Sequence, residues 1–258
     1  MKTKNNTDSL KSMGDCLMNV GAELMSAGAN TGRIQLTLER ISKMWGIKTE
    51  LMITNRVLLI TVFIPDSDQF ITILKRTLPH AANFTVISGV SRMTWRAVEQ
   101  MSTVDQINDD LKRLKAKPHY NRWIVLLFVS LAGFAFCRNL GGTPTDALVT
   151  FTATFAGLFV RQEAHKKKFN IYLTVLFAAL TATMITGIYS KFFLLDTKEH
   201  IAHATSVLFL IPGIPLINSF SDLIDGNHLN GILRSVNGLI IAFSIALGFY
   251  ITWVIIGL

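Results

Sequence analysis

The side chains in this sequence that are best spaced for binding chemistry follow two closely spaced prolines. In the stretch LFLIPGIPLINSFSDLIDG, Pro212 and Pro215 lie on either side of Gly213, and Asn218 and Asp222 come shortly after them. Asn218 and Asp222 are one helical turn apart, so on a helix they share a face. A carboxylate and an amide on one face predict a polar site within an otherwise apolar segment.

Enzyme chemistry has little support in the sequence. Asp222 and Asp225 have the spacing of paired carboxylates, but no nucleophile accompanies them. His200, His203 and Glu199 are close enough for a metal site, but the sequence offers no further ligand beside them. The chain also contains no phosphate-binding loop, dinucleotide fingerprint or hydrolase nucleophile motif. We therefore predict a protein without catalytic residues, metal ligands or a cofactor.

The apolar context of the two prolines gives them a different meaning. Proline removes a backbone donor and breaks a helix, and freed backbone groups in lipid must face protein or a water-filled cavity. Transporters use such broken helices to bind ions and substrates. We expect Pro212, Gly213 and Pro215 to open the backbone beside Asn218 and Asp222. The alternative is a proline kink that ends in a hydrophilic loop, with both Asp222 and Asp225 fully in water.

Charge and apolar residues are distributed unevenly along the 258 residues. Half of the residues are apolar, 16% are charged, and the mean hydropathy is +0.40. The first 122 residues hold 17 basic and 11 acidic side chains, whereas the remainder holds 8 and 6. This split predicts a membrane protein with a small cytoplasmic α+β domain, residues 1–120, followed by a transmembrane domain, residues 121–258.

The net charge and the cysteines exclude several other classes. The net charge of +8 does not indicate a nucleic-acid partner, because the basic residues cluster at the ends of apolar runs. Cys16 and Cys137, in different halves, can form neither a disulfide framework nor a zinc pattern. The polar N-terminus shows no apolar core of a signal peptide.

The second half predicts a bundle of five transmembrane helices, of which the fourth is broken by proline. Its second and fourth members are short for a bilayer, which needs roughly 20 residues. Small residues predict close helix packing, although their hydroxyl groups could also line a polar path. The expected spans are 123–140, 145–160, 171–189, 205–220 and 233–258.

Basic residues indicate how these spans are oriented in the bilayer. They gather before the first span, after the second and at the start of the fifth, whereas the opposite side holds few. By the positive-inside rule the N-terminal domain is cytoplasmic. Five spans then place the C-terminus outside.

The first half reads as helices around a small sheet. Apolar residues at a helical period predict a helix over 9–29, in which glycines every seventh residue suggest close contact with another backbone. A second helix is expected to begin near Asn30 and to end at Gly46. TELMIT, VLLITVF and QFITILKR predict three strands, and 86–114 is expected to be mainly helical.

Three stretches together resemble the threonine/serine exporter family, and the resemblance extends from about Gly14 to the C-terminus. The most specific is IPGIPLINSFSDLIDGNHLNGILR, which is similar to the family's Pro-Gly-x-Pro-Leu-x-Asn … Asp-x-x-x-Gly signature. GAELMSAGANTGRI and GGTPTDALVTFTATFAGLFVRQ agree with its first helix and first two spans, although GGTPTD lacks the aromatic residue that the family has before the Asp. Within the family, the chain resembles the shorter, two-component branch, and in it the larger subunit of the bacterial succinate exporter.

This resemblance implies an exporter of the bacterial inner membrane that carries dicarboxylates or hydroxy amino acids. It also implies a partner, because longer family members continue into a second membrane domain. That half would be a second small membrane subunit in an oligomeric complex within the lipid bilayer.

Beside the residues around the broken helix, four side chains flank the first two spans and are candidate substrate contacts. A guanidinium can hold a carboxylate through two hydrogen bonds, so Arg161 is a plausible first contact for an anionic substrate, unless it only anchors the topology. Two other functions stay open: a membrane-anchored binding or scaffold protein, and a channel. The four candidates are Arg138, Asp146, Arg161 and Gln162.

Overall fold

The computed structural model describes residues 2–54, 56–77, 82–116, 120–193 and 199–257. The chain forms two compact units. The N-terminal unit comprises Met1–Pro118 together with Ile214–Ser235, and the bundle unit comprises His119–Gly213 together with Val236–Leu258. The expected boundary at residue 120 remains a prediction, and the segment 214–235 is grouped with the N-terminal unit.

Two helices open the N-terminal unit, α1 (Lys2–Ser26) and α2 (Thr31–Met44). The side chain of Asn30 caps α2 by accepting a hydrogen bond from the amide of Arg33 at 3.0 Å. After α2, Gly46 has φ +69°, which a residue with a side chain rarely adopts. The second helix therefore begins and ends as predicted. The first helix starts seven residues earlier than expected.

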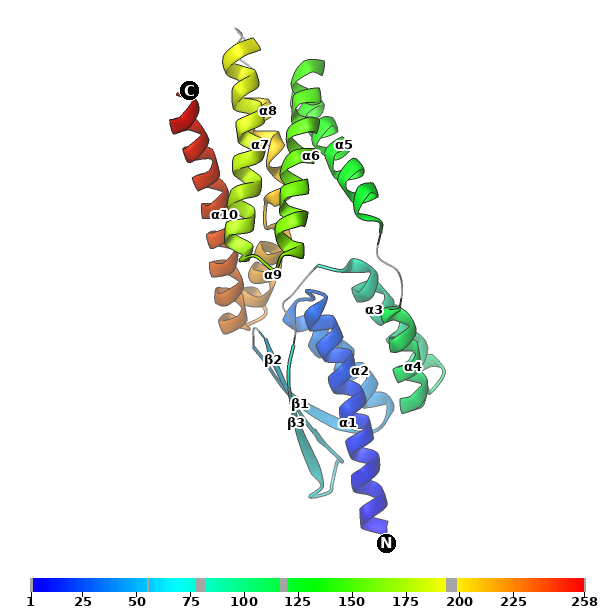
Figure 1. The fold of residues 1–258 in the computed structure, drawn as a ribbon. Coiled ribbons are helices and arrows are strands. Elements are labelled where there is room, and N and C mark those ends of the chain that lie inside the picture. The colour runs from blue at the N-terminus through cyan, green and yellow to red at the C-terminus, as the bar shows by residue number, and fades with distance from the viewer. Residues whose placement is uncertain (1, 55, 78–81, 117–119, 194–198, 258) are drawn as a thin grey trace. The chain divides into compact units, whose positions relative to one another are not determined.

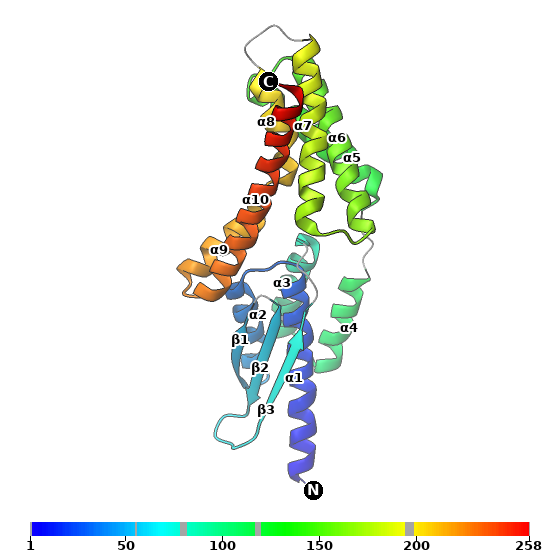
Figure 2. The same ribbon diagram turned by 60° about the vertical axis from the view of Figure 1, so that its left-hand side comes forward.

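The three expected strands form an antiparallel sheet in the order β1 (Lys48–Ile53), β2 (Val57–Phe63) and β3 (Phe70–Arg76), which Figure 2 shows edge to edge. The amide of Thr54 donates to the carbonyl of Val57 at 2.9 Å and closes the first hairpin. Alternate residues of β2 are fully buried, as its period predicts: Leu58, Ile60 and Val62.

The glycines of α1 allow this helix to lie close to the sheet, as Figure 1 shows. A Cβ on Gly14 would lie 2.9 Å from Cδ1 of Ile73, and one on Gly21 would lie 2.6 Å from Cδ2 of Leu58. The predicted close contact with another backbone is therefore wrong in detail, because strand side chains fill these places. Gly28 has a different role. It follows the end of α1 and adopts φ +81°, a left-handed conformation that favours glycine at the end of a helix.

Two further helices complete this region, α3 (Phe84–Glu99) and α4 (Val104–Lys115). Thr103 and Gln106 form a capping box that starts α4. The indole of Trp45 donates to the carbonyl of Ser102 at 3.1 Å and ties the end of α2 to the turn before α4. The predicted helical character of 86–114 is confirmed, with one break.

The rest of the chain is helical. The helices are α5 (Arg122–Asn139), α6 (Pro144–Lys166), α7 (Ile171–Phe193), α8 (Glu199–Ser206), the short 3₁₀ helix η1 (Leu208–Leu210), α9 (Gly213–Ile224) and α10 (His228–Ile256). Among the described residues, α5, α7 and α10 are long and apolar enough to cross a membrane, and Ile201–Leu210 with Gly213–Ile224 passes the same test as a bent pair. These three or four candidate spans fit a membrane protein, whereas the five-helix bundle remains a prediction.

Small residues bring the helices of the bundle unit together, as expected. A Cβ on Gly157 of α6 would lie 2.8 Å from the carbonyl oxygen of Ala178 on α7. One on Gly248 of α10 would lie 2.8 Å from the Cβ of Ala179. Both alanines are fully buried. Helices approach closely in lipid where such residues line the contact.

Candidate functional site

The predicted break at the prolines is confirmed. The 3₁₀ helix η1 ends at Leu210, Ile211 and Pro212 are not helical, and α9 begins at Gly213. Pro215 is the third residue of α9, where its missing amide hydrogen removes no bond from the helix. Pro212 therefore marks the break, and Pro215 belongs to the start of the next helix.

Arg161 of α6 lies against the backbone at this break. Its Nη1 donates to the carbonyl of Phe209 at 3.1 Å. In a continuous helix that carbonyl would accept from the amide of Gly213, but this amide donates to the carbonyl of Ile211 instead, at 2.9 Å. The guanidinium thus satisfies a backbone acceptor that the break set free.

Among the described residues, the charge of Arg161 is not balanced by a nearby acid. Within the described part of the chain, no carboxylate oxygen lies within 4.0 Å of its guanidinium, whereas Arg122 is paired with Glu163 at 2.7 Å. The amide oxygen of Gln162 is buried and has no hydrogen-bond partner among the described residues. Arg161 and Gln162 together offer a cation and a free acceptor at one end of α6.

Arg138 and Asp146 have local partners in the loop that joins α5 to α6. Nη1 of Arg138 donates to the carbonyl of Gly142 at 2.6 Å. Asp146 is 2% exposed and forms a capping box with Thr143, whose amide donates to Oδ2 of Asp146 at 2.7 Å. These contacts start α6 and hold its loop, and a part in substrate binding stays a prediction for both residues.

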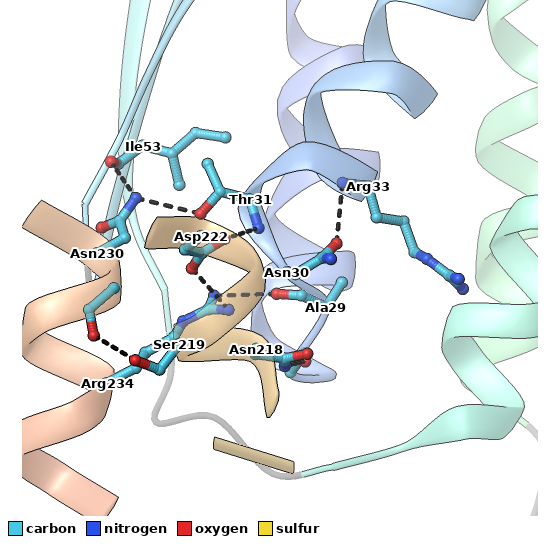
Figure 3. A network of polar contacts seen from close by, with 12 residues as sticks. Ala29, Asn30, Thr31, Arg33, Ile53, Asn218, Ser219, Asp222, Asn230 and Arg234 are labelled. Carbon is cyan, nitrogen blue, oxygen red and sulfur yellow. Dashed lines mark hydrogen bonds and ion pairs between the residues drawn. The ribbon is translucent and has the colours of Figure 1, made fainter. Parts of the chain in front are cut away.

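Asn218 and Asp222 lie in a buried polar network of the N-terminal unit, shown in Figure 3. The amide of Thr31 donates to Oδ1 of Asp222 at 2.9 Å, and Nη1 of Arg234 lies 3.0 Å from its Oδ2. Asp222 is fully buried. Because Thr31 is the first residue of α2, the carboxylate also lies at the positive end of that helix dipole. The alternative in which both aspartates are in water is therefore wrong for Asp222.

The turn that ends α1 accepts two further hydrogen bonds from this network. Nη2 of Arg234 donates to the carbonyl of Ala29 at 3.0 Å, and the side-chain amide of Asn218 donates to the carbonyl of Gly28 at 2.8 Å. The face that Asn218 and Asp222 share therefore lies against the turn between α1 and α2. Asp225, on the other hand, is exposed.

Sequence reasoning missed several members of this network. Asn230 donates to the carbonyl of Ile53 at 2.8 Å and to the hydroxyl of Thr31 at 3.2 Å. Arg234 is the basic residue at the start of the fifth expected span, where the sequence indicates only the orientation of that span. Asn230, Arg234 and Asn237 are spaced by four and three residues within an apolar segment, and this polar stripe was the available signal.

Buried hydroxyl groups pair across the helices of the bundle unit. Each pair joins two helices through side chains alone, and the threonines in these pairs are at most 2% exposed. This arrangement is compatible with close packing, and the polar path remains a hypothesis. The pairs are Thr150 with Thr205 at 3.2 Å, Thr183 with Thr252 at 2.6 Å, and Thr186 with Nδ1 of His203 at 2.8 Å.

The candidate residues thus fall into separate groups. Asn218 and Asp222 are together in the N-terminal unit. Arg161 contacts the backbone carbonyl of Phe209 at the break. Arg138, in the last turn of α5, and Asp146, in the first turn of α6, lie on either side of the loop that joins these helices. In the portion that the structure describes, no three His, Cys, Asp or Glu side chains are grouped to hold a metal ion. The side chains of Glu199 and His200 lie outside that portion.

Most of the chain is similar in sequence to known proteins. A sequence profile of the threonine/serine exporter family matches residues 15–256. The chain is 24% identical over 212 residues to "Probable succinate transporter subunit YjjP" of Klebsiella aerogenes, covering 82% of this chain and 81% of that protein. It is 24% identical over 239 residues to the protein of the same name in Escherichia coli K12, covering 92% of each.

The chain also matches part of a longer protein. The chain is 20% identical over 244 residues to "Probable threonine/serine exporter" of Mycobacterium tuberculosis, which covers 92% of this chain and 45% of that protein. No solved structure matches the chain.

Proposed function

Because the chain belongs to the threonine/serine exporter family, we propose that it is an export subunit that moves small carboxylate metabolites out of the cell. The members of this family are transporters, so the chain is a membrane transport protein and not an enzyme. Its cargo is a succinate-like dicarboxylate, or threonine and serine. Both kinds of cargo carry a carboxylate, which is the group that the site is proposed to bind.

We propose that the chain works with a second small membrane subunit in an oligomeric complex. Two relatives are named as subunits, and the chain corresponds to 45% of a longer exporter. Both observations support a transporter whose remaining half is a separate protein. Purification of the tagged chain from its native membrane, followed by identification of the proteins that co-purify, tests this partnership.

Arg161 is the observation that carries the proposed site. A charged side chain in a membrane bundle is costly and commonly functional, and this one has no acid within 4.0 Å among the described residues. Its Nη1 donates to a backbone carbonyl at the break, and we propose that its other N–H groups donate to a cargo carboxylate. We propose that Pro212 and Gly213 supply the opened backbone and that Gln162 lies beside it.

The proposed arrangement in the inner membrane follows the charge distribution. The cytoplasmic α+β domain, residues 1–120, precedes the transmembrane domain, residues 121–258, and the latter has five spans with the C-terminus outside. Lys166, Lys167 and Lys168 form a cluster of positive charge at the end of α6, which supports a cytoplasmic location for that end. A reporter fused after Leu258 that proves cytoplasmic contradicts this topology.

Substitutions at Arg161 test the proposed function. We expect Arg161→Lys to slow efflux of labelled succinate or threonine from cells that also contain the partner, because an ammonium lacks the planar donor pair. Arg161→Gln should lower efflux by roughly 10- to 100-fold, since a hydrogen bond between charged groups is worth about 1.5–3 kcal/mol. Lys167→Gln, which removes an exposed charge from the end of the same helix, is the matched control. Wild-type efflux in Arg161→Gln refutes the proposed site.

A further inference from the structure

The carboxylate of Asp222 lies in a cradle that other residues build. The amide of Thr31 donates to one carboxylate oxygen at 2.9 Å, and the guanidinium of Arg234 meets the other at 3.0 Å. This is how proteins bind free carboxylates: one donor at a helix N-terminus, where the dipole favours an anion, and one guanidinium. The geometry is that of an anion site in which the anion belongs to the chain itself.

The two donors of this cradle are held by bonds that do not involve Asp222. Nη2 of Arg234 is fixed by the carbonyl of Ala29 at 3.0 Å. Thr31 is the first residue of α2, a helix of 14 residues, and Asn30 caps the amide of Arg33 rather than that of Thr31. The first amide of α2 therefore stays available for an anion when Asp222 leaves.

The fully buried side chains of α9 are polar, although the half-buried Leu223 also packs beside Gly231 of α10. The buried residues of α9 are Ser219 and Asp222, whereas Ile217 and Phe220 are each 67% exposed and Ile224 is 83% exposed. The helix thus turns its polar face inward and exposes three of its large apolar side chains. A second carboxylate in the cradle would replace the contacts of Asp222 with contacts of the same kind. The remaining polar contacts of α9, from Asn218 to the carbonyl of Gly28 and from Ser219 to the carbonyl of Gly231, are the ones that a movement of α9 must break.

Breaks in the chain lie at both ends of α9. Ile211 and Pro212 precede it without helical structure, and Asp225–Asn227 follow it as a turn in which Gly226 has φ +81°. Helix-terminal positions of this kind absorb the backbone changes of hinge motions. A movement of α9 about these two breaks would carry Asp222 out of the cradle.

We propose that the cradle of Thr31 and Arg234 is a binding site for the carboxylate of the exported cargo, and that Asp222 occupies it as an internal ligand. This inference rests on the proposed function, because it takes the cargo to be a small carboxylate. Cargo binding displaces Asp222 and releases α9, the helix that follows the break at Pro212. The N-terminal unit thereby senses cargo and acts on the broken helix through the chain itself.

Chemical rescue tests whether the cradle accepts a free carboxylate. The full chain with Asp222→Ala, purified in detergent, should unfold at a lower temperature than wild type, and acetate should raise its midpoint by about 2–4 °C at five times the dissociation constant. Acetamide, a neutral molecule of the same shape, should have no effect. Acetate should also fail in Asp222→Ala with Arg234→Gln. Equal responses to acetate and acetamide, or rescue without Arg234, overturn the proposal; if Asp222→Ala does not fold, Asp222→Ser with formate replaces it.

A buried reporter tests whether cargo displaces Asp222 in the intact cradle. Ser219 is 1% exposed on the inner face of α9, so Ser219→Cys should be alkylated slowly in a chain whose Cys16 and Cys137 are replaced by alanine. We expect succinate or threonine, but not succinamide, to accelerate alkylation severalfold. A rate that neither carboxylate changes overturns the inference. If efflux still depends on Arg161 in that case, the proposed function stands and only the cradle proposal fails. If the carboxylates accelerate alkylation but Arg161→Gln leaves efflux unchanged, the cradle proposal stands and the proposed site at Arg161 fails.

Discussion

The ion pair between Asp222 and Arg234 can be tested by removing the guanidinium alone. In Arg234→Met, an unbranched apolar side chain of similar length takes the space of the arginine. Asp222 keeps only the amide of Thr31, at 2.9 Å, and loses the partner at 3.0 Å on its other oxygen. The carbonyl of Ala29 loses the donor on Nη2 of Arg234 as well.

The expected loss of stability is large because both side chains are buried. The side chain of Asp222 is 0% exposed and that of Arg234 is 12% exposed, so water cannot replace the lost partner. Removing one member of a buried pair costs about 3–5 kcal/mol. With a shift of about 2–4 °C per kcal/mol for a chain of this size, the midpoint should fall by about 6–20 °C.

Thermal unfolding of the purified chain in detergent measures this effect. Arg33→Met is the matched control, because Arg33 lies in the first turn of α2, beside Thr31, but is exposed. The midpoint of this variant should stay near that of wild type. Asp222→Asn combined with Arg234→Met should recover part of the loss, because no charge is then left buried.

Two results would refute this reasoning. The first is a midpoint for Arg234→Met within about 2 °C of wild type, which corresponds to less than about 1 kcal/mol. The second is an additive double variant, because additivity means that the two side chains do not interact. Either result would show that Asp222 is not held as a buried, paired carboxylate.

Three further predictions concern other parts of the molecule. Burial, and secondarily the charge of Asp105, raises the pKa of the Cys16 thiol to about 12, so with Cys137→Ala the folded chain should resist alkylation at pH 8 and react once denatured; prompt labelling of the folded chain contradicts this. Gly157→Ala should cost about 1–3 kcal/mol, since the new Cβ would lie 2.8 Å from a carbonyl of α7; Gly213→Ala, with nothing within 4 Å, should unfold like wild type. Asn30→Ala should destabilise the chain by about 1 kcal/mol through loss of the α2 cap, and an unchanged midpoint would exclude that role.

Several elements could be predicted because their signals are local. The apolar spacing of Ile34, Leu38 and Ile41 defines one face of a helix, and these three residues are buried in α2. The alternation in β2 and the cap at Asn30 are equally local. Pro212 breaks the helix wherever it lies, because its ring removes a donor and clashes with the preceding turn.

The partners of the candidate site could not be predicted in the same way. Asp222 accepts from Thr31, which is 191 residues away, and Arg161 donates to Phe209, which is 48 residues away. No period or motif links such positions. The spacing of Asn218 and Asp222 showed that they share a face, but it did not show that this face is turned inward against the end of α1.

The sequence by itself therefore determined where helices, strands and the break occur, and that the second half is apolar enough for a membrane. These features depend on dihedral preferences and hydrophobic periods within a few residues. Only the tertiary structure decided that α9 buries its polar face and that a carboxylate from one end of the chain occupies the start of a helix near the other. The reason is physical: a buried charge must find donors wherever packing brings them, and packing depends on the whole chain.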